Sequence, residues 1–477
     1  MPPAIRDCHT CNRRRIRCDR AVPSCKKCAQ KGIVCPGFGT RFRWTISTTH
    51  HGELQVLERF RSSRKTTMTK KIPHPCSKAE SVKFVPEPSV LDPRLGEREL
   101  SLNSPISRML AHYANSIATM MVWIDSEQNE YRKIIVPLAK VQETLMLSIL
   151  AVVSTHRPGT LPTKIGPPGD VSETAVLQIT ERLRSMARDA MVRDCEQHEA
   201  FIAAALILSN YALLNSELSV AWIHLNAVRV LIRTAALSTA SNAKLFSFLK
   251  NQAAAFDVLA CTATFDPAKI EGVILPEIHN DNVMFGLFLL TLQGITSRHL
   301  SQEAAIGSLE SLTTISEVEN QLELARASTL RAAESLSSSS SKVFSSKLIE
   351  DDFVRMVQVY HHAGVLYAHL RLTRVRDPVG IEYHSSRLFQ TLDSFEDYRA
   401  TCHNLAWPLF IAGICCWPNI DRMKSTRKLT QIVAENTQFG HYGSIVRFHQ
   451  CLWESPHLDW INLATDWESR GTPLIPV

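Results

Sequence analysis

Residues 8–35 read CHTCNRRRIRCDRAVPSCKKCAQKGIVC, and the cysteines of this stretch decide how the N-terminal part of the chain folds. The stretch holds two tandem copies of the pattern C-x2-C-x6-C. The cysteines are Cys8, Cys11, Cys18, Cys25, Cys28 and Cys35. A C-x2-C turn that opens a short helix directs two thiolates at one metal ion, and the third cysteine returns after a further turn and loop. The spacing therefore predicts a metal-binding head.

The number of cysteines indicates how many ions this head binds. Zinc takes four ligands in a tetrahedron, so three cysteines per copy leave each ion one ligand short. Two zinc ions that share two bridging thiolates remove the shortage, because six thiolates then fill eight coordination positions. The sequence thus predicts zinc as the cofactor, with two ions per chain.

Charge is distributed unevenly along the 477 residues. The chain carries a net charge of +7, but residues 1–71 hold 17 Lys and Arg against 4 Asp and Glu, a net +13. The remaining residues hold 36 Lys and Arg against 42 Asp and Glu, a net −6. A basic segment ahead of a mildly acidic body indicates a polyanionic partner for the N-terminal part.

The compartment is predicted from the cysteines and from the apolar stretches. Thirteen cysteines cannot all pair, and no apolar signal segment follows Met1, so we expect a reducing compartment in which clustered cysteines bind metal. The longest apolar stretch, residues 200–214, is interrupted by Ser209 and Asn210. It falls short of the roughly 18 residues of a spanning helix, so we expect no membrane as a partner.

Three regions follow one another in the sequence: a head at 1–45, a linker at 46–104 and a body at 105–477. The linker lacks sustained periodicity and holds five prolines, so we expect it to be flexible or extended. In the body, apolar residues recur at helical spacing and strand-like alternation is scarce, which predicts a large all-α domain. The predicted helices are 107–123, 142–155, 173–192, 196–214, 220–236, 245–264, 283–297, 301–335, 348–374, 383–397, 405–416, 421–435 and 442–453.

The cysteine spacing of residues 8–35 resembles that of the fungal binuclear zinc cluster family of transcription factors. The resemblance implies that Cys8 and Cys25, the first cysteine of each copy, are the bridging ligands. It implies that one zinc is held by Cys8, Cys11, Cys18 and Cys25, and the other by Cys8, Cys25, Cys28 and Cys35.

The same resemblance implies double-stranded DNA as the partner of the head. A basic pair at the positions of Arg14 and Arg15 ends the first short helix and reaches guanine edges in CGG-like triplets. Arginine suits this role because its planar guanidinium group can donate hydrogen bonds to O6 and N7 of guanine at the same time. The other basic residues would lie nearer phosphates and supply sequence-independent affinity. They are Arg13, Arg17, Arg20, Lys26 and Lys27.

The body resembles the second type of fungal-specific transcription factor domain, which implies an all-α regulatory domain. The motifs that carry the resemblance include NEYR at 129–132, IVPLA at 135–139 and WIHL at 222–225. His198-Glu199 is followed by Ile202 where a zinc protease motif needs His, and the sequence holds no Walker A loop, nucleophile elbow or dinucleotide fingerprint. We therefore expect no enzyme activity.

Two functional hypotheses from different classes remain at this stage. The first is a sequence-specific DNA-binding regulator of RNA polymerase II genes in a fungal nucleus. The second is a metabolite-sensing or scaffold protein that acts through protein contacts, with a purely structural zinc head. The sequence leaves open whether the body forms a homodimer or binds a small-molecule effector or a coactivator.

Overall fold

The computed structural model divides the chain into two compact units. The first comprises residues 1–89 with 184–191, and the second comprises 90–183 with 192–477. The residues that the structure describes are 10–11, 14, 16–21, 25–31, 47–48, 54–55, 105–156, 195–236, 242–278, 284–304, 314–338, 344–372, 377–454 and 459–477.

Two short strands are described within the predicted linker. They are β1 (Ser47–Thr48) and β2 (Leu54–Gln55), which pair antiparallel with Ser47 opposite Gln55. The remainder of 46–104 and the predicted helix 173–192 lie outside the described residues. The predicted domain boundaries stay predictions.

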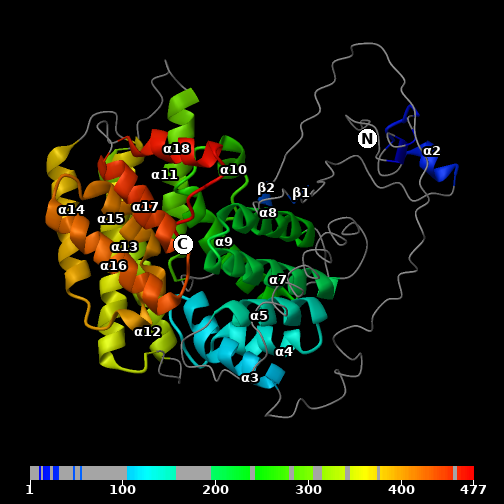
Figure 1. Ribbon diagram of the computed structural model, residues 1–477, viewed down its shortest axis with the longest axis horizontal. Helices are drawn as coiled ribbons and strands as arrows, with labels where there is room; N and C mark the ends of the chain where they lie inside the picture. Colours follow the sequence, from blue (N-terminus) through cyan, green and yellow to red (C-terminus); the bar gives the residue numbers. More distant parts are fainter. Residues whose placement is uncertain are drawn as a thin grey trace. The chain divides into compact units, whose positions relative to one another are not determined.

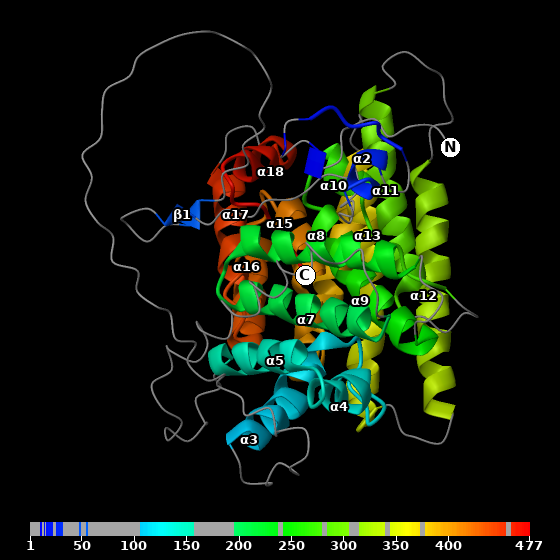
Figure 2. The ribbon, with the colours of Figure 1, turned by 90° about the vertical axis from the view of Figure 1, so that its right-hand side faces the viewer.

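The first part of the body consists of short helices followed by three long ones (Figure 1). The short ones are α3 (Pro105–His112), the π-helical turn η2 (Tyr113–Ile117), the 3-10 turn η3 (Ala118–Met121), the π-helical turn η4 (Tyr131–Ile135), α4 (Val136–Ala139) and α5 (Glu143–Thr155). The long ones are α7 (Cys195–Leu214), α8 (Leu218–Ala235) and α9 (Ala243–Cys261). Helix α7 packs between α5 and α8, which explains why its residues 200–208 are buried on every face (Figure 2).

The second part of the body is a bundle around one central helix. Helix α13 (Lys347–Leu372) packs against α11, α12, α14 and α15, and 17 of its residues are buried. The other members are α10 (Pro267–Glu271), α11 (Gly286–Ala304), α12 (Ile315–Ser338), α14 (Pro378–Asp393), the 3-10 turns η5 (Tyr398–Ala400) and η6 (Cys402–Asn404), α15 (Ala406–Cys415), α16 (Ile420–Thr437), α17 (Tyr442–Glu454) and α18 (Trp460–Ser469).

The predicted fold class, a small cysteine head followed by a large all-α body, is confirmed. The predicted helix 301–335 is wrong at its start, because α11 continues to Ala304 and α12 begins at Ile315. Thr314 and Glu317 fix that start by a reciprocal capping box, in which each side chain accepts the other residue's backbone N–H, at 3.0 and 3.2 Å. Three helices, α4, α10 and α18, were not predicted.

The two parts of the body are joined by side chains that meet the C-terminal end of α9. Nη2 of Arg371, on α13, donates to the carbonyls of Thr262 and Thr264 at 2.9 and 2.8 Å. Nε1 of Trp407, on α15, donates to Oγ1 of Thr262 at 2.9 Å. The last carbonyls of a helix lack partners within the helix and favour a nearby cation, so α9 is held to two helices of the bundle.

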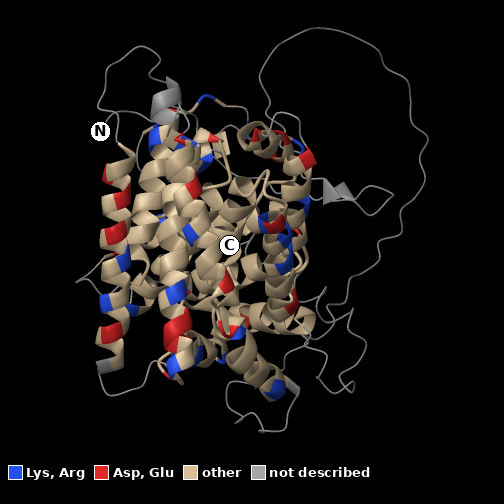
Figure 3. Ribbon diagram, turned by 90° about the vertical axis from the view of Figure 1, so that its left-hand side faces the viewer, with Lys and Arg blue, Asp and Glu red and all other residues tan. Residues whose placement is uncertain are grey.

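The surface of the body mixes both signs of charge. Figure 3 shows Lys and Arg close to Asp and Glu along the outer helices, so neither sign dominates there. Among the described helices none is by itself long and apolar enough to cross a membrane, and only a sharply bent pair, Tyr131–Ala139 with Glu143–Thr155, reaches the required length and composition together.

Gly413 marks a close approach between α15 and α17. A Cβ at this position would overlap the imidazole ring of His449, which is itself buried and lies 3.0 Å from the carbonyl oxygen of Phe410 through Nε2. Gly443, at the start of α17, has open space where a Cβ would stand.

We predict that Gly413→Ala lowers the free energy of unfolding by about 1–3 kcal/mol, because the added methyl group forces the ring out of its site. Gly443→Ala is the matched control, and it should be neutral or stabilising by about 0.5–1 kcal/mol. Urea unfolding of the full chain measures both. Equal stabilities of the two variants would show that the ring moves aside without cost.

Several histidines are buried inside the body as neutral rings. Burial lowers the pKa of His224, His441 and His449 to about 4 from the ordinary value of 6.5. Nε2 of His441 lies 3.1 Å from the main-chain oxygen of Val477, and Nε2 of His449 lies 3.0 Å from that of Phe410. In the unfolded chain the same rings bind protons near pH 6.5.

This difference predicts a body that weakens in mild acid. As pH falls from about 6.5 toward 4, the unfolded state binds protons that the folded state excludes, so the free energy of unfolding decreases. The expected cost at pH 5 is about 1–2 kcal/mol for each fully buried histidine. Urea midpoints at pH 7.5 and pH 5 measure the loss, and His449→Gln, which keeps a donor toward Phe410, should lose less than the parent. A parent and variant with identical pH dependence would contradict the assignment of a neutral His449.

Candidate metal centre and nucleic-acid interface

Four of the six predicted zinc ligands are described, and all four are buried. Cys11, Cys18, Cys25 and Cys28 are 1%, 7%, 0% and 1% exposed. They form a cluster of their own, against which only Ile16 packs among the described residues. Cys8 and Cys35 lie outside the described residues. Within the described part of the head, the cysteines are therefore buried with little apolar material around them.

Two short helical turns present these cysteines. In the first copy, the N–H of Arg14 donates to the carbonyl of Thr10, and the N–H of Ile16 donates to that of Cys11, both at 3.0 Å. In the second copy, α2 (Lys26–Ala29) begins after Cys25, whose Sγ accepts the N–H of Cys28 at 3.3 Å. A sulfur that accepts a backbone N–H is stabilised as a thiolate, which is the form that binds metal.

The sulfur positions fit tetrahedral zinc. Two sulfurs bound to one tetrahedral zinc at about 2.3 Å stand about 3.8 Å apart. Sγ of Cys11 and Sγ of Cys25 are 3.7 Å apart. Sγ of Cys28 completes a group in which the three sulfurs lie within 4.8 Å of one another. The residues present therefore suit a zinc ion held by thiolates.

Cys25 belongs to two groups of metal-ligating side chains at once. The first is the group with Cys11 and Cys28, and the second joins Cys25 to Cys18 and a carboxylate oxygen of Asp19, again within 4.8 Å. A residue shared by two groups is where a bridging ligand should stand. The bridging roles expected of Cys25 and Cys8 and the division of the other ligands between two ions stay predictions.

Asp19 has a structural task that the sequence analysis did not assign. Its Oδ2 accepts the N–H of Lys26 at 3.0 Å, which ties the loop after Cys18 to the first turn of α2. This backbone hydrogen bond lowers the pKa of the Asp19 carboxyl below its ordinary value. The turn between them also needs Arg20 at a φ of 59°, in the left-handed region.

The described basic residues of the head are exposed, whereas the described cysteines are buried. These basic residues are Arg14, Arg17, Arg20, Lys26 and Lys27. Lys31, which is not among the predicted DNA-binding residues, is exposed as well. Arg13 and Arg15 lie outside the described residues. Their predicted contacts, like those of the other basic residues, stay predictions.

Both groups of three or more metal-ligating side chains found among the described residues belong to the head. In the body, His362 and His384 approach within 3.1 Å through their Nδ1 atoms, but Nε2 of His384 faces Glu319 on the other side of its ring. These side chains do not converge on one point, so the described part of the body presents no comparable centre.

Comparison with known proteins assigns both parts of the chain to families. Residues 6–45 match the fungal Zn(2)-Cys(6) binuclear cluster domain, a range that includes all six cysteines. Residues 108–469 match the fungal specific transcription factor domain. Neither description is that of an enzyme, and the first implies zinc binding.

One curated relative shares only a short segment with the chain. It is the acriflavine sensitivity control protein acr-2 of Neurospora crassa, 46% identical over 37 residues. These residues make up 8% of this chain and 6% of that protein, so the likeness covers a small fraction of either. No solved structure matches the chain.

The shared position of Cys25 predicts a graded response to cysteine substitution. Cys25→Ser should reduce bound zinc to below one ion per chain, because both ions lose a ligand. Cys28→Ser should remove about one ion, since it stands in one group only. Elemental analysis of the dialysed full chain measures the zinc content.

Cys451→Ser is the control for these variants, because Cys451 lies in α17 of the body. It should keep the zinc content of the parent. A Cys25→Ser chain that retains as much zinc as the Cys28→Ser chain would exclude the shared position.

Proposed function

The chain belongs to the family of fungal specific transcription factor domain proteins, and from this premise we propose that it regulates transcription by reading a short DNA sequence with its cysteine head. The observation that carries the proposal is the buried cysteine set around Cys25, with every described basic side chain around it exposed. Such a module presents its charge to solvent because the metal, rather than an apolar core, holds it together.

Electrostatics supports a nucleic-acid partner for the head. Two zinc ions and six thiolates carry a net charge of about −2, which leaves the surrounding segment of residues 1–71 clearly positive. Neutralising phosphates with Lys and Arg releases counterions and provides most of the affinity. The body is mildly acidic and mixes both signs of charge, so it offers no comparable attraction.

Sequence reading is assigned to the arginine pair that follows the first helical turn. Arg14 is exposed where that turn ends, and Arg15 follows it in the sequence. We assign to this pair the guanine edges of a CGG-like triplet in the major groove. Lys26 and Lys27, exposed on α2, are assigned to phosphates, together with Arg13, Arg17 and Arg20.

The remaining roles follow from the two-part design. The regulator acts on RNA polymerase II genes in the nucleus, and the all-α body controls the activity of the head. The body does so by forming a homodimer, or by binding a coactivator or a small-molecule effector. A homodimer would add a second triplet through effective concentration without any new base contact.

We predict different defects for the two kinds of basic residue. Arg14→Ala should weaken binding to a CGG-containing duplex by about 1–3 kcal/mol and leave binding to a scrambled duplex nearly unchanged. Lys27→Ala should weaken both duplexes alike and lower the salt slope by about one. Mobility-shift titrations at several salt concentrations measure these values.

Two further variants complete the comparison. Arg14→Lys keeps the charge but loses the guanidinium group that donates two parallel hydrogen bonds, so this variant should lose most of the preference for CGG. Lys424→Ala removes one exposed charge from the body and should bind DNA as the parent does. If Arg14→Ala weakens both duplexes equally, Arg14 contacts phosphate and the proposed base reading is wrong.

A further inference from the structure

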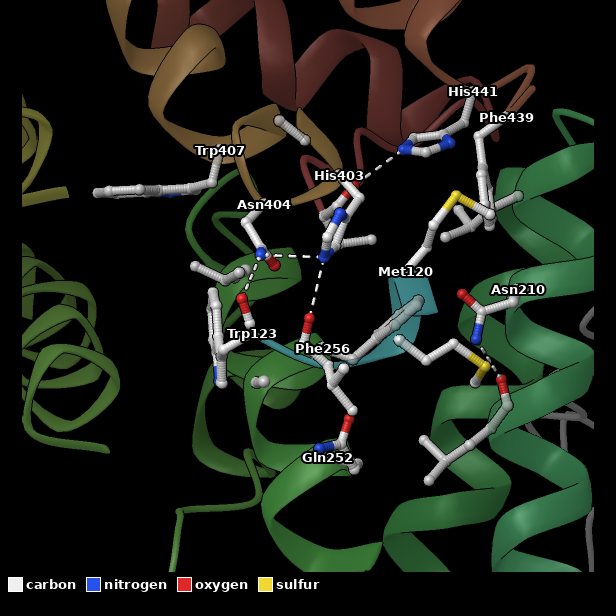
Figure 4. A pocket seen from close by; sticks show the side chains of 18 of the residues that line it. Met120, Trp123, Asn210, Gln252, Phe256, His403, Asn404, Trp407, Phe439 and His441 are labelled. Carbon is white, nitrogen blue, oxygen red and sulfur yellow. Dashed lines mark hydrogen bonds between the residues drawn. The ribbon is translucent and has the colours of Figure 1, made fainter. Parts of the chain in front are cut away.

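A cavity of about 130 Å³ lies inside the body where its three hydrophobic clusters meet. Leu206 of α7 belongs to the first cluster, Trp407 of α15 to the second and Leu213 of α7 to the third, and all three line the cavity. Figure 4 shows the walls, which also come from η3, α9, η6 and the segment between α16 and α17. Segments far apart in the sequence thus enclose one space.

Polar side chains stand on opposite walls of this space. On one wall, Nδ2 of Asn404 donates to the carbonyl of Trp123 at 3.1 Å, and Nε2 of His403 lies 2.9 Å from the carbonyl of Val122 (Figure 4). Gln252, on α9, faces them from the other wall. The main-chain hydrogen bonds fix the first wall, so its polar edge is preorganised for a ligand.

Some polar groups that line the cavity have unused hydrogen-bonding capacity. Tyr131 is only 2% exposed, yet within the described part of the chain its hydroxyl makes no hydrogen bond. The same holds there for the side-chain carboxamide of Gln252. Asn210 donates from Nδ2 to the carbonyl of Leu206 at 3.1 Å, which leaves its Oδ1 as an acceptor. Nδ1 of His441, which also lines the cavity, is buried and has no hydrogen-bond partner among the described residues. Buried polar groups of native proteins are usually paired, so this atom points to a missing partner, whereas Asn210 and Gln252 are only partly buried.

The lining also restricts the charge of that partner. No Asp, Glu, Lys or Arg side chain lines the cavity. Burial lowers the pKa of His403 and His441, which keeps both rings neutral at pH 7. A charged ligand would lose its hydration without gaining a charged side chain in return, and this is costly. The occupant is therefore uncharged.

We propose that this cavity binds a small uncharged aromatic compound that donates and accepts hydrogen bonds, and that the compound is the effector of the regulator. A cavity of about 150 Å³ holds a benzene ring, and this space of about 130 Å³ is partly open to solvent, so the compound has about six to ten non-hydrogen atoms. Trp123, Phe256 and Trp407 supply apolar walls for its ring. The role as effector rests on the proposed function, whereas binding itself does not.

Occupation of the cavity would act on the arrangement of the body. A compound in this space contacts η3, α9 and η6 at the same time, so it favours the arrangement in which these walls are together. A ligand shifts an equilibrium only through such a difference in affinity between two states. The full chain should therefore unfold at a higher temperature when the cavity is filled.

Benzamide and benzoate provide the direct test, because they have the same size and shape and differ in charge. Isothermal titration of the full chain, without DNA, should show saturable binding of benzamide at concentrations below about 10 mM. Benzoate should bind at least about tenfold more weakly. Absence of saturable benzamide binding, or equal affinity for the two compounds, would overturn the proposal.

Variants of the lining locate the bound compound. Gln252→Leu removes the carboxamide without a large change in volume and should weaken benzamide at least about tenfold. Ala255→Met, on the same helix, fills the space and should abolish binding. Gln390→Leu, an exposed glutamine of α14, is the matched control and should bind as the parent does. Parent-like binding by both Gln252→Leu and Ala255→Met would place benzamide elsewhere and contradict the proposal.

The result is independent of DNA binding by the head. Failure of benzamide to bind leaves the DNA-reading proposal intact, because that proposal rests on residues of the head. Conversely, a head that does not bind DNA leaves a measured benzamide site standing, and only its role as effector site is lost.

Discussion

The thiolate of Cys25 is the point on which the head depends. It is fully buried, accepts a backbone N–H from Cys28 and stands in both groups of metal-ligating side chains. Among the described residues of the head, Ile16 is the one apolar side chain that packs against the cysteines, so we expect metal binding to supply the free energy that orders the head. The exposed arginines and lysines take their positions from the turns that the cysteines anchor, so the DNA reading that we propose depends on metal binding.

The body is stabilised mainly by the packing of its helices. Its long helices bury apolar faces, and some of the polar groups that enter the core are held in ion pairs and hydrogen bonds. Arg229 of α8 and Asp257 of α9 form a buried ion pair with Nε and Oδ2 at 2.9 Å, and Oδ2 also accepts the N–H of Ile274 at 2.8 Å. Nδ1 of His441, which lines the cavity, is one of the buried atoms that have no hydrogen-bond partner among the described residues. Such unpaired atoms in a packed core are expected where a ligand binds.

The parts of the structure that could be predicted are those that local sequence controls. The cysteine spacing predicts the metal head because C-x2-C turns form within a few residues, and periodicity predicts α7, α8 and α9 to within three residues at each end. The start of α12 was missed although Thr314 and Glu317 carry a local capping signal. Short helices such as α10 and α18 are not predicted from the sequence, because packing, rather than their own propensity, stabilises them.

The task of Asp19 and the cavity could not be predicted, because both arise between segments. Asp19 accepts the backbone N–H of Lys26, seven residues later in the sequence, and no rule of sequence spacing predicts that contact. The cavity brings Met120 together with Trp407 and Phe439, which only the tertiary fold can do. Sequence patterns indicate the cysteines expected to bind zinc and the basic residues proposed to contact DNA, but they do not show which side chains lack a partner in the core.

Selection of binding sites from random duplex DNA tests the central claim most directly. The full chain, loaded with zinc, is incubated with the random pool, and a parallel sample contains a zinc chelator. The account predicts that zinc-loaded protein enriches a CGG-like triplet and that the chelator abolishes this enrichment. Enrichment of a motif that survives the chelator, or the absence of any enriched motif with zinc, would contradict it.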